Sequence, residues 1–533
     1  MPAPAELVVE GELRSLNPAT LEVVGSVPVT EPGAVEEVVA RAAEVQARWA
    51  EETLDARRRL VLDAARVLLD RIDDLAETVT AETGKPLVES LTSEVLVSVE
   101  NARWVAANAP RVLRPERAPF RQLYLKHKRG WLVYEPLGVV AIVSPWNFPF
   151  AIPFSQAVAA VAAGNAVVVK PSELTPLSGG WVERAFAEAG APPGLVQTVQ
   201  GAGDEVGDAL VRAPGVAKVV FTGSTAVGRR VGMVCAELLR PVTLELGGKD
   251  PMLILADADL GRAVEGALWG AFSNCGQVCA GVERIYVARD RYDEFVSSLA
   301  RRAGELRLGR GDEPAVDLGP LISEAHRAKV EDLVADARER GAEALTGGRR
   351  PAGLGLPGWF YEPTVLIGGD RSARVEREEV FGPVVTVMPF ADEEEAIRLA
   401  NASPFGLGAS VWTRDTARAR QVAARLAAGS VWTNDVAYSY GAGQASWGGV
   451  KASGLGRTHS KHGLYECTQV KFVDADSGRV PVPWWYPYGA DAAEAFRGAL
   501  GVLYGDGVSA RAEAAWRHRR GLFHLARRYL SNP

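Results

Sequence analysis

Three short segments each carry one residue suited to covalent chemistry on a carbonyl group. Cys279 follows a Gly-Gln turn in the run FSNCGQVCA at 272–280. A thiol in such an irregular, partly polar setting can become a nucleophilic thiolate, although a lone cysteine is more often a buried structural residue. Glu245 ends an apolar run in LELGGK at 244–249. A partly desolvated carboxylate suits a general base, and it equally suits a strand end that caps a turn.

The third residue is Asn147, in the run SPWNFPF at 144–150. An amide held between two prolines is a rigid, neutral donor that could stabilise a developing oxyanion. An asparagine in a proline-rich turn is also unremarkable. Each of the three segments is therefore ambiguous when it is taken alone.

The surrounding chain alternates strands with helices. Short β-branched runs at 131–134 and 138–143 end at prolines and are predicted strands. Further strands at 166–169, 195–199 and 218–221 enclose a predicted helix at 178–189. This rhythm predicts parallel strands with right-handed crossovers, as in a Rossmann-like sheet.

Other parts of the chain flank this region. Long amphipathic helices are expected at 34–49 and 54–80, and a second alternating stretch runs from 251 to 431. Beyond Asp474 a proline- and aromatic-rich connector precedes two candidate helices, at 490–504 and 512–530.

Bulk composition excludes several classes of protein. A chain of 533 residues exceeds one hydrophobic core, so two or three domains are expected. A net charge of -7 disfavours nucleic acid as a partner. No apolar stretch is long enough to span a membrane, and the start of the chain does not resemble a secretory signal. Four cysteines are too few for a disulfide framework and fit a reducing cytoplasm. No motif predicts a metal site.

The ambiguity ends when the motifs are taken together. SPWNFPF, ELGGK, FSNCGQVC, EVFGP at 379–383 and WGGVKASGLGR at 447–457 occur in this order. As a set they resemble the aldehyde dehydrogenase superfamily, and the similarity covers roughly residues 15 to 474. The resemblance implies an α/β fold in three parts, with a Rossmann-like cofactor domain, an α/β catalytic domain and a small β oligomerisation arm. We expect the first at 1–114 and 137–246, the second at 247–450 and the third at 115–136 and 464–474, followed by a C-terminal extension at 475–533.

The resemblance also implies a mechanism. Cys279 attacks the aldehyde, and Asn147 with the Cys279 N–H holds the thiohemiacetal oxyanion. Hydride transfer to a nicotinamide leaves a thioester, which water activated by Glu245 hydrolyses. Lys170 joins this catalytic set.

The expected cofactor is NAD, with NADP possible. Glu173, which follows the strand ending near Lys170, would repel a 2′-phosphate. A helix start after Gly223 suits a pyrophosphate. The resemblance places Glu379 on the nicotinamide ribose, Phe381 beside the ring and Trp146 on the pyrophosphate side. The expected cofactor contacts are Trp146, Lys170, Ser172, Glu173, Gly223, Ser224, Glu379 and Phe381.

Substrate identity is less constrained. Phe148, Tyr440 and Trp447, with Phe150 and Tyr438, predict an apolar or aromatic tunnel. Trp447 and the Ser446 before it stand where most relatives have Pro-Phe. One alternative is a succinate-semialdehyde-type enzyme, but only Arg284 lies near the nucleophile in sequence to bind a second carboxylate. Another is a CoA-acylating relative, which the retained Glu245 disfavours. A third is a non-catalytic relative. Cys275 could form a reversible disulfide with Cys279.

Self-association as a homodimer or homotetramer is expected. The last predicted helix is basic and amphipathic, with Trp516, Phe523 and Leu530 at a spacing of seven. Such a helix can lie on a membrane surface. We favour packing on the protein's own acidic surface, with the arm folded over a neighbouring subunit near the substrate entrance.

Overall fold

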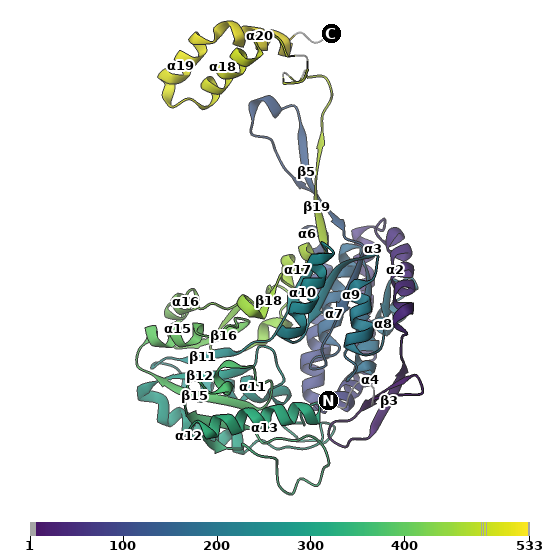
Figure 1. The fold of residues 1–533 in the computed structure, drawn as a ribbon, viewed down its shortest axis with the longest axis vertical. Helices are drawn as coiled ribbons and strands as arrows, with labels where there is room; N and C mark the ends of the chain where they lie inside the picture. Colours follow the sequence, from purple (N-terminus) through teal and green to yellow (C-terminus); the bar gives the residue numbers. More distant parts are fainter. Residues whose placement is uncertain (1–6, 481, 483, 487, 531–533) are drawn as a thin grey trace. The chain divides into compact units, whose positions relative to one another are not determined.

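The structure is a computed structural model that describes residues 7–480, 482, 484–486 and 488–530 (Figure 1). The described chain forms two compact units, one of Met1–Leu113 with Glu135–Gln469 and one of Arg114–Tyr134 with Val470–Pro533. Within the described part, no helix is long and apolar enough to cross a membrane.

The first unit contains a six-stranded sheet whose strand order is β18-β10-β9-β6-β7-β8. All neighbouring strands are parallel except β18, which pairs antiparallel with β10. Valines fill β7 and every one of its residues is buried, as expected for a parallel sheet with both faces covered. The strands are β6 (Val139–Val143), β7 (Ala166–Lys170), β8 (Val196–Thr198), β9 (Val216–Thr222), β10 (Val242–Glu245) and β18 (Gly454–Leu455).

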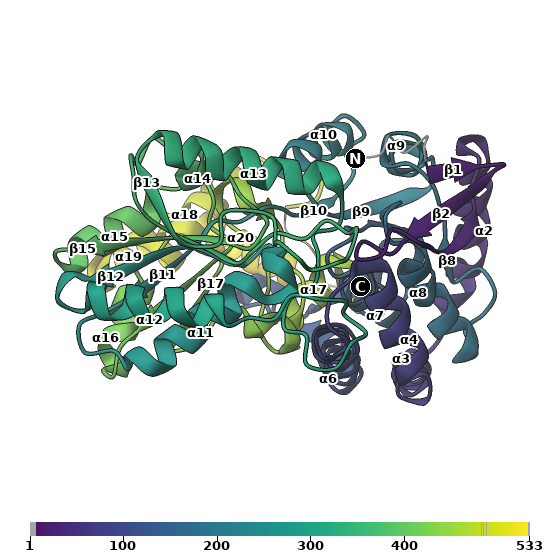
Figure 2. The same cartoon turned by 90° about the horizontal axis from the view of Figure 1, so that it is seen from below.

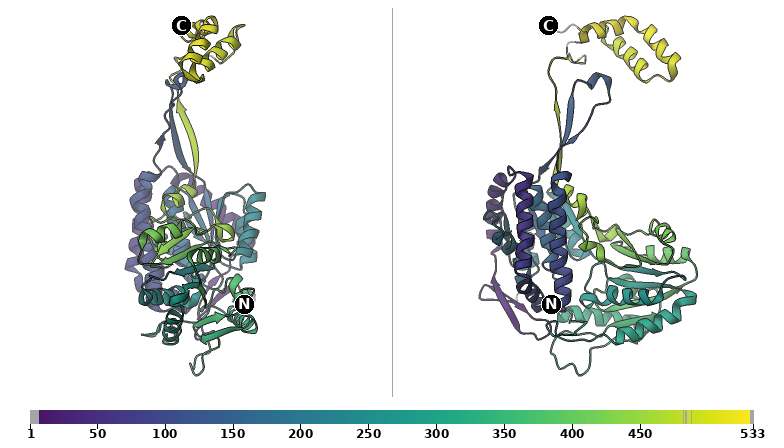
Figure 3. Two further views of the ribbon diagram at one scale, coloured as in Figure 1. Left: turned by 90° about the vertical axis from the view of Figure 1, so that its left-hand side faces the viewer. Right: turned by 180° about the vertical axis from the view of Figure 1, so that it is seen from behind.

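Helices surround this sheet, and α7 (Ala151–Ala163) is buried along nearly its whole length. The right-hand view of Figure 3 shows the purple N-terminal helices together beside the first sheet. The single helix expected at 54–80 is instead two helices, α3 (Leu54–Asp70) and α4 (Ile72–Thr83). Arg71 leaves helical geometry between them, with φ -119° and ψ 27°. The apolar spacing continues across the break, so periodicity alone could not locate it. The other helices here are α2 (Val35–Trp49), α6 (Val97–Val112), α8 (Pro176–Glu188) and α10 (Thr225–Glu237).

A second sheet in the same unit has seven strands in the order β13-β14-β15-β12-β11-β16-β17, all parallel except the β13–β14 pair. Alternate residues of strand β11 (Asp250–Ile254) point to opposite faces of this sheet and pack in two different hydrophobic clusters. Met252 and Ile254 pack with α11, α12 and α13, whereas Leu253 packs with α15 and α16. Figure 2 shows α11 and α12 lying side by side. The strands are β11 (Asp250–Ile254), β12 (Val282–Ala288), β13 (Ala342–Thr346), β14 (Thr364–Gly368), β15 (Val384–Phe390), β16 (Gly408–Trp412) and β17 (Ser430–Thr433). The helices are α11 (Leu260–Phe272), α12 (Tyr292–Gly304), α13 (Glu324–Glu339), α15 (Glu393–Asn401) and α16 (Thr416–Ala423).

The second unit contains most of a three-stranded sheet in the order β19-β5-β4, formed by β4 (Glu116–Arg117), β5 (Arg129–Pro136) and β19 (Thr468–Ala475). Gly130 of β5 lies so close to the Phe472 ring that a Cβ there would come within 2.9 Å of it. Lys128 forms ion pairs with Asp474 and Asp476.

The same unit ends in three helices, α18 (Ala492–Tyr504), α19 (Gly507–Arg517) and α20 (Arg519–Leu530). The single helix expected at 512–530 is therefore wrong, because His518 departs from helical geometry with φ -104°. The break lets α19 and α20 both pack on α18, where Gly498 faces His518 and Leu522 closely. Trp516 and Phe523 consequently lie on different helices rather than on one stripe, and the Leu530 side chain falls outside the described part of the chain.

Candidate active site

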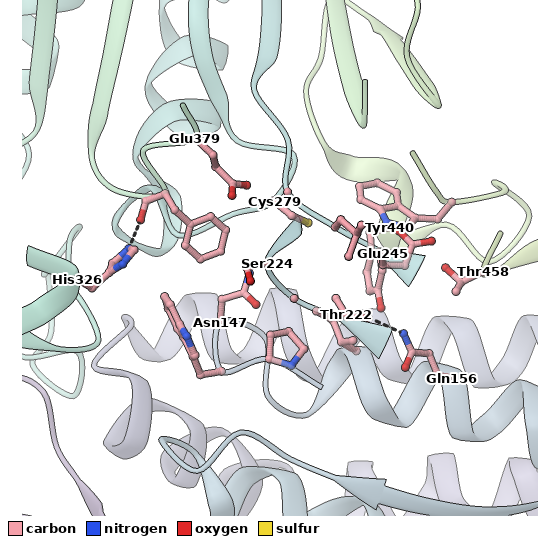
Figure 4. Close-up of a pocket in the computed structure, with 18 of the residues that line it drawn as sticks. Asn147, Gln156, Thr222, Ser224, Glu245, Cys279, His326, Glu379, Tyr440 and Thr458 are labelled. Atoms are coloured by element: carbon pink, nitrogen blue, oxygen red, sulfur yellow. Dashed lines mark hydrogen bonds between the residues drawn. The ribbon is translucent and has the colours of Figure 1, made fainter. Parts of the chain in front are cut away.

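Parallel strands of the first sheet bring Asn147 and Glu245, two of the four expected catalytic residues, to one edge. Carboxyl ends of parallel strands meet at the same edge, where α/β proteins place their ligands. Asn147 lies in the segment after β6, and Glu245 is the last residue of β10. Thr222 ends β9 between them and accepts a hydrogen bond from Gln156 Nε2 at 3.0 Å (Figure 4).

Cys279 comes from the second sheet, in the loop between the turn Ser273–Gly276 (η5) and β12. The turn is left-handed, with φ of 49° at Asn274, 56° at Cys275 and 70° at Gly276. A Cβ at Gly276 would meet the Gly382 carbonyl oxygen at 2.1 Å, so only glycine fits this position. Figure 4 shows Cys279 between Glu379 on one side and Glu245 with Tyr440 on the other.

Two cavities meet at this thiol. One, of about 240 Å³, contains Asn147 and Glu245 together with Trp146, Gly223, Ser224, Glu379 and Phe381. The other, of about 420 Å³, is lined mainly by apolar side chains and includes Phe148 and Tyr438. Residues that border both cavities are Ile152, Cys279, Tyr440 and Trp447. The arrangement allows two different molecules to reach one sulfur atom from opposite sides.

Glu245 is buried, and neither of its carboxylate oxygens has a hydrogen-bond partner among the described residues. Burial raises the pKa of Glu245 to about 8, against the opposing positive charge of Arg457. The Arg457 guanidinium is held nearby by the carbonyl oxygens of Gly449 and Gly456. A carboxyl group with a pKa in this range can exchange protons at neutral pH, which is what a general base requires.

The surroundings of Cys279 favour the neutral form of its thiol. Burial raises its pKa well above the ordinary value, and the negative charges of Glu245 and Glu379 raise it further. Nucleophilic attack therefore requires that a base remove the thiol proton as the reaction proceeds. Glu245 borders the same cavity and has oxygens available for this proton.

The Asn147 side chain has a fixed orientation. Its Nδ2 donates a hydrogen bond to the Gln277 carbonyl oxygen at 3.0 Å. Because an amide nitrogen carries two hydrogens, one remains for a group bound in the cavity. The donor can therefore be used without first breaking an existing hydrogen bond.

The two glycines of ELGGK make room for neighbouring groups. A Cβ at Gly247 would come within 2.5 Å of a Glu379 carboxylate oxygen, and one at Gly248 would meet the Cys279 carbonyl oxygen at 2.2 Å. The Gly248 N–H donates to Glu379 Oε1 at 2.8 Å. Burial, reinforced by the charge of Glu283, raises the pKa of Glu379 to about 7. These two glycines thus join Glu245, Glu379 and Cys279 into one site.

An aromatic cluster lines the first cavity. Trp146 makes edge-to-face contacts with Phe381 and His326, at centroid distances of 5.4 Å each. His326 Nε2 lies 2.6 Å from the Phe381 carbonyl oxygen, and Lys329 Nζ donates to the Glu379 carbonyl oxygen at 2.8 Å. Burial lowers the pKa of His326 to about 4, so its ring is neutral. Sequence reasoning missed His326 and Lys329, whose spacing of three on α13 was the available signal.

Some expected site residues lie elsewhere. Lys170 and Glu173 form an ion pair of 3.0 Å at the end of β7, and neither they nor Ser172 line either cavity. Phe150 is fully buried against Phe154 at 4.9 Å, so its expected place in the tunnel is wrong. Arg284 is buried and donates to the carbonyl oxygens of Lys249, Leu399 and Ala400.

Cys275 and Cys279 are not joined by a disulfide. Cys275 is buried in the core with α11 and lines neither cavity.

The residues of the first cavity fit a dinucleotide with a nicotinamide ring. The start of α10 presents backbone N–H groups beside Gly223 and Ser224, which suits a pyrophosphate. The Glu379 carboxylate matches ribose hydroxyls, and the Phe381 ring supplies a flat apolar surface. Beyond these lies the Cys279 thiol, with the apolar second cavity on its other side. The α/β fold and a cavity of this kind are typical of an oxidoreductase that uses a dinucleotide.

Comparison with known proteins gives the family. Residues 8–473 match the aldehyde dehydrogenase family. A betaine aldehyde dehydrogenase of Cereibacter sphaeroides is 39% identical over 467 residues, which cover 88% of this chain and 94% of that protein. An NAD+ complex of an aldehyde dehydrogenase from Bacillus cereus superposes with a TM-score of 0.84 at 36% identity, covering 87% of this chain and 93% of that one. An NADP-dependent enzyme of E. coli gives a TM-score of 0.83, also at 36% identity, with 87% and 95% covered.

The chain belongs to the aldehyde dehydrogenase family, and it is an enzyme that oxidises aldehydes with NAD(P). Both the expected family and the expected α/β fold are confirmed. Residues 474–533 lie outside the matched region.

Proposed function

We propose that this enzyme converts an apolar or aromatic aldehyde to its carboxylic acid through a thioester on Cys279. The observation that carries the proposal is the position of the Cys279 thiol, which borders both cavities together with Asn147 and Glu245 in the first. The acyl group would thus be formed at the one point that substrate and cofactor both reach.

The chain's own residues divide the work. Glu245 takes the Cys279 proton, the sulfur adds to the aldehyde carbon, and the second Asn147 amide hydrogen stabilises the resulting alkoxide with the Cys279 N–H. When it is bound, the dinucleotide supplies the hydride acceptor that turns the thiohemiacetal into a thioester. Glu245 releases the cysteine proton to solvent and can then remove a proton from water as that water attacks the thioester carbon. The acid leaves as the C–S bond breaks, and the Cys279 thiolate takes the proton back from Glu245.

The proposed cofactor is NAD in preference to NADP. Glu379, Phe381, Trp146, Gly223 and Ser224 would hold it, as their place in the first cavity supports. Glu173 at the end of β7 supports the preference, because its carboxylate would repel a 2′-phosphate. Lys170 lies outside both cavities, which argues against a role in catalysis. Its ion pair with Glu173 at the end of β7 keeps it beside Ser172 and Glu173, with which it is proposed to bind the cofactor.

The second cavity supports the proposed substrate class. Phe148, Tyr440 and Trp447 line it, and Tyr440 meets Trp447 edge to face at 5.1 Å. Trp447 also packs near Trp432, at 6.4 Å. A carboxylated semialdehyde is disfavoured because the Arg284 guanidinium donates to carbonyl oxygens and to the Tyr286 hydroxyl.

A cationic aldehyde is a second candidate substrate. Several relatives are betaine aldehyde dehydrogenases, and two carboxylates, Glu89 and Glu100, line the second cavity here. Aromatic rings can also hold a quaternary ammonium group. Glu89 accepts the Asn274 N–H, and burial raises the pKa of Glu89 to about 7, so its charge is partial near neutrality. Glu100 is exposed and supplies the more accessible carboxylate.

A substrate series separates the two candidates. We expect kcat/KM for phenylacetaldehyde and long-chain aldehydes to exceed that for betaine aldehyde, measured by NADH absorbance. Glu100→Gln should leave the apolar aldehydes unchanged and lower kcat/KM for betaine aldehyde by no more than about 5-fold, the usual effect of an exposed charge. Glu44→Gln, on the exposed face of α2, is the matched control. Preference for betaine aldehyde in the unmodified enzyme would favour the cationic class.

We also propose self-association, as a homodimer or homotetramer. Strand β19 is at the edge of its sheet, and its Val470 and Phe472 side chains are more than half exposed. An exposed edge strand with apolar side chains is a ready template for pairing with another chain. We retain 1–114 with 137–246, 247–450, and 115–136 with 464–474 as the proposed cofactor, catalytic and oligomerisation parts. The proposed compartment is the cytoplasm, which suits four free cysteines.

The extension at 475–533 is proposed to fold over a neighbouring subunit near the substrate entrance. Its helices expose Tyr504, Trp516 and Phe523, which are costly to leave in water. They also carry seven arginines against three acidic residues within 492–530, in a chain whose net charge is -7. Apolar side chains among positive charges suit docking on an acidic protein surface.

Removing residues 474–533 tests this proposal. The truncated enzyme should have a lower Tm or a smaller assembly by light scattering, and a higher ratio of activity on bulky aldehydes to activity on acetaldehyde. Binding of the full-length protein, but not the truncated one, to anionic vesicles would instead show a membrane role. Unchanged stability, assembly, substrate range and vesicle binding would contradict both interpretations.

A further inference from the structure

A buried ammonium group lies directly behind the segment that carries Asn147. Lys85 follows Gly84, the left-handed residue that ends α4, and its side chain has no exposed surface. Lys85 Nζ donates to the Asn147 carbonyl oxygen at 2.8 Å and to Glu94 Oε1 at 2.9 Å. The same nitrogen lies 4.4 Å from the centre of the Phe148 ring, which lines the second cavity. One charge therefore contacts the backbone of Asn147 and the side chain of the next residue.

Glu94 holds the other end of this segment. It is also fully buried, and its Oε2 accepts the N–H groups of Phe150 at 3.2 Å and Ala151 at 2.7 Å. These are the first amides of α7, which have no partners within the helix, so a carboxylate here is favourable. Lys85 and Glu94 thus fix the chain on both sides of the tight Asn147–Phe150 turn.

The position of Glu94 depends on an unusual piece of helix. Ser90–Leu96 is π-helical and lies between α5 (Leu87–Glu89) and α6. Within it Ser90, Glu94 and Val95 are buried, whereas Thr92, Ser93 and Leu96 line the second cavity. π-helical turns are rare and occur often at functional sites. The segment provides both a wall of the substrate cavity and the buried carboxylate behind it.

A second donor reaches the same carbonyl oxygen from the cysteine loop. Asn274 Nδ2 donates to the Asn147 carbonyl oxygen at 3.0 Å and lies 3.2 Å from the Gln277 carbonyl oxygen. The Gln277 carbonyl oxygen is also the acceptor for the Asn147 side chain. Lys85 and Asn274 therefore hold the backbone carbonyl group of Asn147, and the Gln277 carbonyl oxygen holds its side-chain amide. One hydrogen of the side-chain amide remains for a bound group.

We propose that Lys85 and Glu94 are positioning residues that hold the Asn147 amide where the alkoxide of the thiohemiacetal forms. The inference rests on the proposed role of Asn147 as the oxyanion donor. Preorganised donors are effective because they need not reorient as charge develops. Neither residue borders the cavity that contains Asn147, so both act through it.

Removing one charge alone would leave the other buried without a partner, which destabilises proteins strongly. The variant Lys85→Met/Glu94→Gln avoids this outcome. Methionine keeps most of the lysine volume, and the glutamine oxygen can still accept the Phe150 and Ala151 amides. What the double variant lacks is the donor to the Asn147 carbonyl oxygen.

The readout is acylation of Cys279, measured in two ways. One is the pre-steady-state formation of NADH, and the other is cofactor-independent release of p-nitrophenolate as the thiolate attacks p-nitrophenyl acetate. Both pass through a tetrahedral oxyanion. We expect each to slow by about 10- to 100-fold, in line with the cost of a misplaced catalytic group. Alkylation of Cys279 by iodoacetamide involves no oxyanion, so its rate should be unchanged in the double variant. The Kd for NAD should be unchanged as well.

A double-mutant cycle decides whether the effect passes through Asn147. Asn147→Ala alone should slow acylation by about 10²–10³-fold, and adding Lys85→Met/Glu94→Gln to it should cause little further loss. Asn274→Ala, which removes the other donor and keeps the ion pair, should give a smaller loss that also vanishes in the Asn147→Ala background.

Three outcomes contradict the proposals, and they are distinguishable. Normal acylation in Lys85→Met/Glu94→Gln would overturn the positioning role. An equal loss with and without Asn147 would show that the pair acts by another route, and would overturn it as well. Normal acylation in Asn147→Ala would remove the oxyanion role on which the inference rests.

Discussion

Replacing Cys279 with alanine should reduce aldehyde oxidation by roughly 10⁴–10⁶-fold, the scale of losing a catalytic nucleophile. No other cysteine lines either cavity among the described residues, so none can substitute for it. NAD should still bind with nearly unchanged Kd, because the proposed contacts at Glu379, Phe381 and Ser224 remain. Steady-state NADH formation and isothermal titration with NAD measure the two quantities.

Cys275→Ala is the matched control for that variant. Cys275 is buried in the core and lines neither cavity, so its loss should leave kcat within a few-fold of the original. Appreciable dehydrogenase activity in Cys279→Ala would exclude the thioester mechanism. Reversible protection of Cys279 against peroxide that disappears in Cys275→Ala would show that the two cysteines form a disulfide.

Much of the first sheet was predictable from local sequence. Valine-rich runs between prolines and glycines gave β6 and β7 nearly residue for residue, because both strands are buried on two faces. The sequence pattern also predicts that Asn147 and Glu245 lie at the same edge of the sheet. Both residues come at the carboxyl ends of strands that alternate with helices. Motif order then indicated the partner residue, Cys279.

What could not be predicted depends on contacts between distant parts of the chain. The breaks at Arg71 and His518 interrupt helices whose apolar spacing continues unchanged. Lys85 and Glu94 lie 62 and 56 residues before their partners Asn147 and Phe150, and no local pattern connects them. A weak signal existed in the polar residues Glu94, Ser98 and Asn101, whose helical spacing places them on one face. The structure buries all three.

The Glu245→Gln enzyme should form the thioester more slowly and hydrolyse it more slowly still. Glutamine keeps the shape of the side chain and cannot accept a proton, so thioester hydrolysis should slow by about 10²–10⁴-fold. The expected signature is a slowed first turnover of NADH formation followed by still slower steady-state turnover, with an acyl group on Cys279 detected by mass spectrometry. An unchanged first turnover would show that another group deprotonates the thiol.

In the unmodified enzyme, the hydrolysis rate should rise with pH through about 8, the pKa of the buried Glu245 carboxyl, because only the ionised form is a base. Glu245→Gln should lack this step in its profile. A pH-independent rate across this range in the unmodified enzyme would show that another group activates the water.

The same burial predicts that this variant gains stability relative to the original enzyme as the pH rises. The pKa of Glu245 is raised from 4.5 to about 8 on folding, so the folded state favours the protonated carboxyl. Its contribution to stability is therefore complete below the unfolded pKa and is lost as the pH rises through about 8. Glutamine does not ionise and escapes this loss. The difference in Tm between Glu245→Gln and the original should thus shift in favour of the variant between about pH 5 and about pH 9. A difference in Tm that does not change with pH would mean that the Glu245 carboxylate gains compensating partners on ionisation. Its pKa would then be raised less than its burial indicates.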